Sequence, residues 1–294
     1  MPTISDGLES FLADMTHRRK LRPNTIRAYR YDLQRAANAF PMALDAISIH
    51  DIEAWLTHDH PAASTSNRRA ASLGRFFTWA QRQALCVSNP VTLRDPGPAP
   101  RRLPNPIRSE QHRRQLDAAI QAMAHPYRLI FQLLRETGMR AGEALGLNKG
   151  DVCLDGGREG LRIREAKNGY ERTVILDPDA TPRTLRGLRH WMREHSTLPD
   201  HVPLFCSNRK SRVAYHALYH QWQQLCIRAG LIDAHGTPLY TIHQLRHTRG
   251  TELMEQGYRL EIVQRLLGHR DPRSTQRYAE VSDIVVRTTL AAKK

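Results

Sequence analysis

The residues most suited to chemistry lie in the C-terminal segment HQLRHTRGTELMEQGYRLEIVQRLLGHRDPRSTQRY, which begins at His243. His243 and Arg246 are one helical turn apart, His269 ends the run LLGH, and Tyr278 follows nine residues later. A phosphodiester resists attack because its oxygens are already negative and gain charge in the transition state, so cationic donors aimed at them lower the barrier. A tyrosine phenol can then act as a covalently held nucleophile if nearby cations stabilise its phenolate.

Two earlier segments supply the other groups that such a reaction needs. The run ETGMRAGEALGL (136–147) places Arg140 after a helix-ending Thr-Gly pair and Glu143 one turn further on. The departing sugar oxygen requires a proton, which a lysine or a histidine can deliver. Lys167 lies in the sequence AKNGY, at the expected tip of a hairpin, whereas Lys149 and Lys210 do not.

Together these motifs resemble those of the tyrosine recombinases, the phage-integrase and Xer-type site-specific recombinases. The resemblance covers most of the chain and implies a role for each motif residue. Arg140 and Arg246 would clamp the scissile phosphate, and Lys167 would protonate the leaving 5′ oxygen. His243 would hydrogen-bond the phosphate or assist proton transfer, and His269 would hydrogen-bond the phosphate. Glu143 would orient catalytic side chains, and Tyr278 would be the nucleophile.

The resemblance further implies that the chain cleaves and rejoins DNA strands through a 3′-phosphotyrosyl intermediate, without a metal or another cofactor. The expected partner is double-stranded DNA with inverted half-sites, bound by a homotetramer that is a monomer when free. Two alternatives stay open, a type IB topoisomerase-like enzyme and a non-catalytic DNA-binding relative. Inverted half-sites would argue against the topoisomerase, and loss of Arg140, Arg246 or Tyr278 would have favoured the non-catalytic relative.

The spacing of His243 and His247 also fits one half of a zinc site. Zinc proteases of the H-E-x-x-H type carry a glutamate after the first histidine, and Gln244 stands there instead. The four cysteines are far apart and form no C-x-x-C pair. We therefore expect no metal site, and we assign His247 a structural role. Gln244 also departs from the family, which commonly has aspartate at this position.

The charge of the chain favours a polyanionic partner. The net charge is +15, and 44 residues are basic, of which six are lysine and 38 arginine. The arginine guanidinium matches phosphate oxygens well, although a GC-rich genome would also enrich arginine. The sequence contains no apolar run long enough to span a membrane and does not start with a signal-peptide pattern, so we expect a cytoplasmic protein.

Residues 1–89 are predicted to be helical, with a basic flank that either clamps duplex DNA or is a solvated helix face. The resemblance implies that they form the SAM-like core-binding domain of the family. Apolar residues recur at helical spacing in four segments. The last helix is expected to expose arginines that contact DNA. The four helices are predicted at about Ser5–Thr16 with Ser5 as the cap, Pro23–Ala37, Ser48–Leu56 and Ser64–Ala84, and the exposed arginines are Arg68, Arg69, Arg75 and Arg82.

A proline-rich linker is predicted at residues 90–107, because six of the 17 residues from Pro90 to Pro106 are proline. Arg101 and Arg102 within it are further candidates for DNA contacts. Residues 108–294 are predicted to be a mixed α/β catalytic domain with a C-terminal tail, so the fold class is mainly α with a small β-sheet. Its elements are predicted as helices at about 109–124, 126–137, 141–147, 182–196, 214–229, 242–256, 260–267 and 283–291, and a hairpin of strands 161–164 and 172–176.

Overall fold

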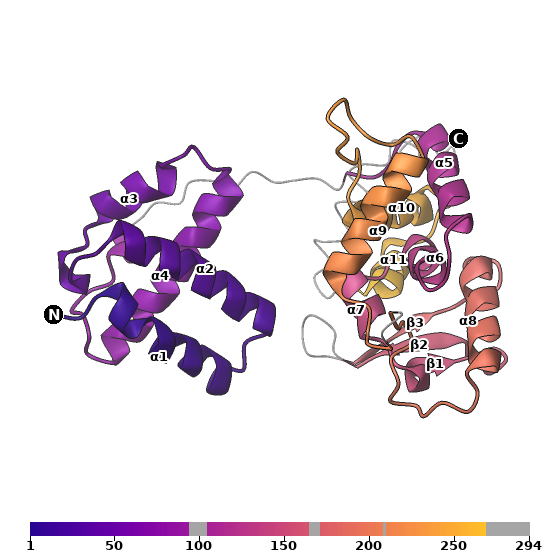
Figure 1. Cartoon of the computed structure of the whole chain (residues 1–294), viewed down its shortest axis with the longest axis horizontal. Coiled ribbons are helices and arrows are strands. Elements are labelled where there is room, and N and C mark those ends of the chain that lie inside the picture. Colours follow the sequence, from indigo (N-terminus) through magenta and orange to yellow (C-terminus); the bar gives the residue numbers. More distant parts are fainter. Residues whose placement is uncertain (94–104, 165–170, 208–209, 269–294) are drawn as a thin grey trace. The chain divides into compact units, whose positions relative to one another are not determined.

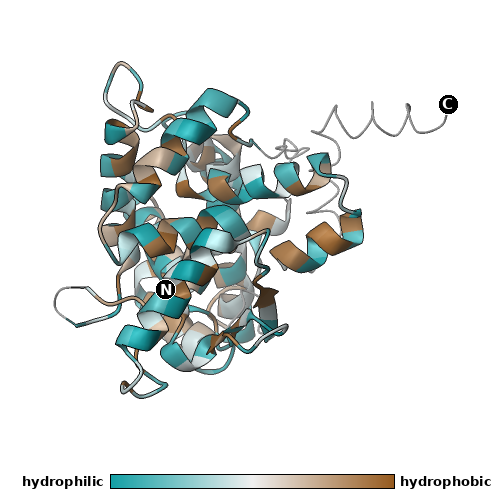
Figure 2. Ribbon diagram, turned by 90° about the vertical axis from the view of Figure 1, so that its right-hand side faces the viewer, coloured by the Kyte–Doolittle hydropathy of each residue, from teal (hydrophilic) through white to brown (hydrophobic). Residues whose placement is uncertain are grey.

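The computed structural model describes residues 1–93, 105–164, 171–207 and 210–268. The chain divides into two compact units, Met1–Arg102 and Leu103–Lys294 (Figure 1). The described elements are mostly helices with one small sheet, which confirms the predicted fold class. The helices carry apolar and polar residues on different faces, seen as alternating brown and teal along their ribbons in Figure 2. No helix in these ranges is long and apolar enough to cross a membrane.

Four α-helices form the described part of the first unit, and capping side chains define where two of them begin. Thr3 caps α1 by accepting a hydrogen bond from the Asp6 backbone, while the Asp6 side chain accepts from the Thr3 backbone. The prediction that Ser5 caps this helix is therefore wrong, because Ser5 already lies in the first turn. Ser48 and Asp51 make the same reciprocal pair at the start of α3, the helix that the sequence predicts to begin at about Ser48. The helices are α1 (Ile4–His17), α2 (Pro23–Ala39), α3 (Ile49–Thr57) and α4 (Ala63–Arg82).

An aromatic cluster holds α1 and α4 together. The ring of Phe11 in α1 lies 5.6 Å from that of Phe76 and 5.7 Å from that of Trp79, both edge-on. A Cβ at Gly7 would lie 3.1 Å from the Phe76 ring, so glycine permits the close approach of the two helices. Edge-to-face pairs add about 0.5–1.5 kcal/mol each beyond the burial of their area.

The arginines predicted to lie exposed on α4 differ in their surroundings. Arg69 is 8% exposed, and its guanidinium lies over the ring of Trp55 at 5.5 Å from the centroid. The prediction that Arg69 lies exposed is therefore wrong, because its guanidinium packs on an aromatic ring of another helix. Arg68 is partly exposed and forms an ion pair with the buried Asp32. Arg75 and Arg82 line a surface cavity of about 600 Å³ with Arg18 and Arg19.

The second unit packs helices around α6 and adds a three-stranded antiparallel sheet. Strand β2 pairs with β1 on one side and β3 on the other, and Ile163 lies opposite Arg172. The predicted hairpin is thus confirmed, whereas the short strand β1 was not predicted. The elements are α5 (Glu110–Gln121), α6 (Tyr127–Thr137), α7 (Ala141–Gly146), β1 (Val152–Cys153), β2 (Gly160–Ile163), β3 (Arg172–Ile175), α8 (Pro182–Glu194), α9 (Tyr215–Arg228), α10 (Ile242–Glu255) and α11 (Leu260–Leu267).

Helix α6 is buried on almost every side, which makes it the centre of the second core. Its residues from Leu129 to Leu134 are all buried, and Phe131 packs against Trp222 of α9 at 5.7 Å between ring centroids. The indole nitrogen of Trp222 donates to the Tyr240 carbonyl at 2.8 Å, just before α10 begins. The core therefore sets the position of the N-terminal end of α10.

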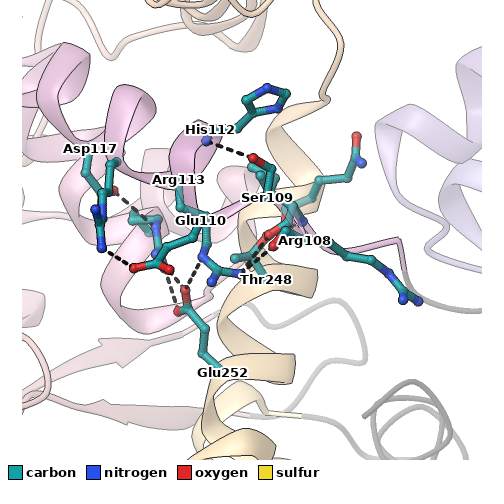
Figure 3. A network of polar contacts seen from close by, with 12 residues as sticks. Arg108, Ser109, Glu110, His112, Arg113, Asp117, Thr248 and Glu252 are labelled. Carbon is teal, nitrogen blue, oxygen red and sulfur yellow. Dashed lines mark hydrogen bonds and ion pairs between the residues drawn. The ribbon is translucent and has the colours of Figure 1, made fainter. Parts of the chain in front are cut away.

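A network of hydrogen bonds and ion pairs also attaches α10 to α6 and to the segment before α5 (Figure 3). Both terminal nitrogens of Arg135 in α6 donate to the carboxylate of Glu252 in α10 at 2.7 Å. Asp117 of α5 accepts from the same guanidinium at 3.2 Å. The backbone nitrogen of Ile107 donates to the Thr248 hydroxyl at 2.9 Å, so the first described residues of this unit are also bound to α10.

Replacing Glu252 with Gln should destabilise the second unit, because the largely buried side chain of Arg135 would lose its bidentate carboxylate partner. Removing one member of a buried pair costs about 3–5 kcal/mol, and the partial exposure of both side chains argues for the lower end. Urea unfolding of the whole chain measures the loss. Glu255→Gln in the same helix is the matched control, and equal stability of the two variants would contradict this role of the network.

Candidate active site

The first site segment is a tight turn between α6 and α7. Gly138 ends α6 with a left-handed backbone (φ 66°), and the Thr137 hydroxyl accepts a hydrogen bond from the Met139 nitrogen at 3.2 Å. The turn makes Arg140 the N-cap residue of α7. Its guanidinium is 29% exposed, so it can be reached by a substrate.

Glu143 holds Arg140 in place through both of its carboxylate oxygens. Oε1 accepts from Nη1 of Arg140 at 2.9 Å, and Oε2 accepts from the Arg140 backbone nitrogen at 3.0 Å. The Glu143 side chain is only 4% exposed, so its carboxylate acts on its neighbours and not on solvent. This geometry fits the orienting role that the sequence predicts for Glu143.

A third residue, Arg172, completes this cluster and was not among the predicted site residues. Nη2 of Arg172, at the start of β3, donates to Oε2 of Glu143 at 2.8 Å. Burial by itself would raise the pKa of the Glu143 carboxyl, but the charge of Arg172 and the bonds and charge of Arg140 hold that pKa below its usual range. Glu143 is therefore ionised at neutral pH and carries two guanidinium partners.

Arg246 joins three segments that are far apart in the sequence. It is 3% exposed, and its two terminal nitrogens donate to the carbonyls of Gly138 and Leu267, each at 2.8 Å. The first carbonyl lies two residues before Arg140, and the second lies two residues before His269. The guanidinium thus fixes the turn that presents Arg140 to the end of α11, from which the chain continues towards His269 and Tyr278.

His243 and His247 lie on successive turns of α10, with their rings edge-on at 4.7 Å. His243 is exposed and His247 is partly buried. Burial first, and then the charges of His243 and Arg246, lower the pKa of His247 to about 4, so its ring is neutral at physiological pH. A neutral ring against His243 fits the structural role predicted for His247.

Gln244, the departure from the family pattern, has a defined local function here. Its side-chain oxygen accepts from the Thr241 backbone nitrogen at 2.7 Å, while the Thr241 hydroxyl accepts from the Gln244 backbone. This capping box begins α10 one residue before His243. An amide at this position therefore orients the first turn of the helix without adding a negative charge beside the histidine.

Several predicted site residues lie outside the described residues, namely Arg101, Arg102, Lys167, His269 and Tyr278. The strands on either side of Lys167 are described, as is the end of α11 at Gly268. The structure thus brings Arg140, Glu143 and Arg246 into one cluster with Arg172, with His243 on the helix that carries Arg246. Within the described ranges, no group of three or more His, Cys, Asp or Glu side chains is placed to hold a metal.

Two family models match the chain, and together they cover both units. Residues 106–284 match the model of the phage integrase family, and residues 8–84 match that of the phage integrase N-terminal SAM-like domain. The first match covers more than half of the chain and contains every predicted catalytic residue. The chain therefore belongs to the phage integrase family of tyrosine-type site-specific DNA recombinases.

Individual relatives agree with this assignment. The chain is 31% identical to tyrosine recombinase XerD of Ralstonia nicotianae, over 98% of this chain and 93% of that protein. It is 32% identical to tyrosine recombinase XerC of Mycobacterium sp. strain KMS, over 96% and 95% of the two chains.

The fold is also similar to those of solved structures. The lambda integrase (75–356) dimer bound to a COC′ core site has a TM-score of 0.74, 19% identity and coverage of 94% of this chain and 95% of that chain. The XerH recombinase bound to palindromic difH has a TM-score of 0.72, 23% identity and coverage of 99% and 84%. These two likenesses concern the fold.

Gly138 offers a test of the turn that presents Arg140. A Cβ at this positive-φ position would lie 2.7 Å from Cδ2 of the buried Leu267, so Gly138→Ala should cost about 1–3 kcal/mol and displace the carbonyl that binds Arg246. The rate of DNA cleavage should fall together with the stability. Gly142→Ala is the matched control in α7, where a Cβ meets nothing within 4 Å and should stabilise the helix slightly. Thermal unfolding and a cleavage assay on both variants check this, and unchanged cleavage in Gly138→Ala would contradict it.

Proposed function

We propose that this chain cleaves a DNA strand with Tyr278 and rejoins it through a 3′-phosphotyrosyl intermediate. The observation that carries the proposal is the bridge made by Arg246, whose guanidinium binds the carbonyls of Gly138 and Leu267. This bridge supports a site in which the segment of Arg140 and the segment leading to His269 and Tyr278 serve one phosphate.

In this proposal the tyrosine oxygen attacks the phosphorus, and the bond from phosphorus to the 5′ oxygen breaks. Arg140 and Arg246 stabilise the charge that accumulates on the phosphate oxygens, and His243 and His269 add hydrogen bonds to them. Arg246 would share its terminal nitrogens between the phosphate and the carbonyls of Gly138 and Leu267. Lys167 gives the proton that the leaving 5′ oxygen takes up.

Rejoining is the reverse of cleavage. A 5′ hydroxyl from the same or a partner strand attacks the phosphotyrosyl bond and restores the tyrosine. The energy of the phosphodiester is kept in the covalent link, so the exchange needs no nucleotide hydrolysis. Neither step consumes a cofactor, because arginines supply the positive charge at the phosphate.

We assign duplex DNA as the substrate on the strength of charge and family membership. A net charge of +15 predicts strong, salt-dependent attraction to a phosphate backbone. In the first unit, Arg75 and Arg82 line a cavity together with Arg18 and Arg19, which makes this face the best candidate for phosphate contacts. Arg68 is a weaker candidate because the buried Asp32 engages it, and Arg101 and Arg102 remain sequence-based proposals.

The oligomeric state, the form of the DNA site and the cellular location are also proposals. A lambda integrase structure is a tetramer bound to a Holliday junction, and it has a TM-score of 0.71 to this chain at 19% identity. We propose that this chain likewise exchanges strands as a homotetramer on inverted half-sites, in the cytoplasm where its DNA lies. The curated relatives are recombinases, which favours this function over that of a type IB topoisomerase.

Replacing Tyr278 with Phe should abolish covalent attachment to DNA while leaving DNA affinity within about two-fold, since only the nucleophilic oxygen is lost. A nicked suicide substrate traps the adduct, which denaturing gel electrophoresis detects, and fluorescence anisotropy measures the affinity. Tyr219→Phe is the control, because Tyr219 lies exposed on α9 and should form adduct normally. A persistent adduct in Tyr278→Phe would remove this residue from the role.

A further inference from the structure

We propose that Arg172 is a positioning residue of the cleavage reaction, which holds Glu143 and through it sets the place and the free charge of Arg140. The inference rests on the proposed function, because it concerns the same phosphate site. Arg172 is the first residue of β3 and follows the segment that contains Lys167. A side chain at this position can therefore connect the hairpin of β2 and β3 to the turn between α6 and α7 that ends at Arg140.

Arg140 and Arg172 both donate hydrogen bonds to the carboxylate of Glu143. Oε2 accepts from Arg172 Nη2 at 2.8 Å and from the Arg140 backbone nitrogen at 3.0 Å, and Oε1 accepts from the Arg140 side chain at 2.9 Å. With one negative charge between two guanidiniums, the cluster keeps one net positive charge. Arg172 thus prevents Glu143 from neutralising Arg140, the more exposed of the two at 29% against 16%.

Arg172 also packs against the backbone that leads to His269. A Cβ at Gly268 would collide with Cζ and Nε of Arg172 and would lie 2.7 Å from its Nη1. Glycine at position 268 therefore allows the guanidinium to lie directly on the end of α11. Through this contact one side chain touches both the Glu143 cluster and the residue that precedes His269.

The contact with Glu143 uses only one nitrogen of the Arg172 guanidinium. Its Nε and Nη1 are buried and have no hydrogen-bond partner among the residues that the structure describes. These two nitrogens are the ones nearest to Gly268. Buried donors without partners are costly and uncommon, so these two nitrogens are donors of Arg172 that its contact with Glu143 does not satisfy.

Removing Arg172 should change how the site depends on pH. Among the described residues, the charges that act on Glu143 are Arg140 on its own helix and Arg172 from β3. Without Arg172, burial would raise the pKa of Glu143 and only Arg140 would oppose the rise. Glu143 would then take up a proton as the pH falls through the raised value, and a neutral carboxyl cannot hold both the backbone and the guanidinium of Arg140.

The test measures single-turnover adduct formation on the nicked suicide substrate from about pH 5 to about pH 9. Arg172→Gln should slow the reaction about 10- to 100-fold, leave the DNA dissociation constant within about three-fold, and move the acid limb of the rate profile to higher pH. Arg172→Lys keeps the charge and should restore the pH profile more than the rate. Arg162→Gln is the control, because Arg162 lies opposite Thr173 on the same hairpin and pairs with Asp151 and Glu171 instead.

A double-mutant cycle decides whether Arg172 works through Glu143. Adding Arg172→Gln to Glu143→Gln should slow the reaction little beyond Glu143→Gln alone, since the shared carboxylate is already gone. The proposal would be overturned if the rate losses of the two single variants multiplied in the double variant. It would also be overturned if Arg172→Gln left the pH profile unshifted, or if it lost no more rate than Arg162→Gln. If Arg172→Gln fails to fold by circular dichroism, Arg172→Lys and its pH profile decide. A wild-type protein that forms no adduct at Tyr278 would instead refute the proposed function.

Discussion

The second unit depends on a buried guanidinium whose partners are backbone carbonyls. Arg246 is 3% exposed and reaches Gly138 and Leu267, which are separated from it by 108 and 21 residues. A buried cation is tolerated only where acceptors surround it, so these segments must come together for the fold to form. The contacts that satisfy Arg246 therefore hold two segments against α10, namely the turn that leads to Arg140 and the end of α11.

Charge sharing at Glu143 complements this arrangement. A site for phosphate needs positive charge that is held in place but not neutralised. Two guanidiniums on one buried carboxylate satisfy both conditions, since the carboxylate orients Arg140 and a net positive charge remains. Elsewhere in the unit an arginine charge is balanced by carboxylates, as where Arg135 of α6 pairs with Glu252 of α10 and Asp117 of α5. The polar groups around Arg135 thus stabilise the unit, whereas we propose that those around Glu143 serve the substrate.

Local patterns in the sequence predicted most elements because their causes are local. Ser48 with Asp51, Gly138 after Thr137, and the alternation in residues 161–164 and 172–176 each act over a few residues. The exposure of Arg69 was predicted wrongly because a basic residue at helical spacing gives no sign of an aromatic partner such as Trp55, which belongs to another helix. Arg172 was missed for a similar reason, since an arginine that starts a strand is ordinarily a solvent-exposed one.

The sequence by itself determined the class of protein, because the motifs that identify this class are short and have their own spacing. It also determined where most helices and the hairpin lie, through caps, glycines and apolar periodicity. Only the tertiary structure decided which charges share a partner. Glu143 meets Arg172 across 29 positions, and Arg246 meets Gly138 across 108, because burial brings them together and no local preference encodes such a contact.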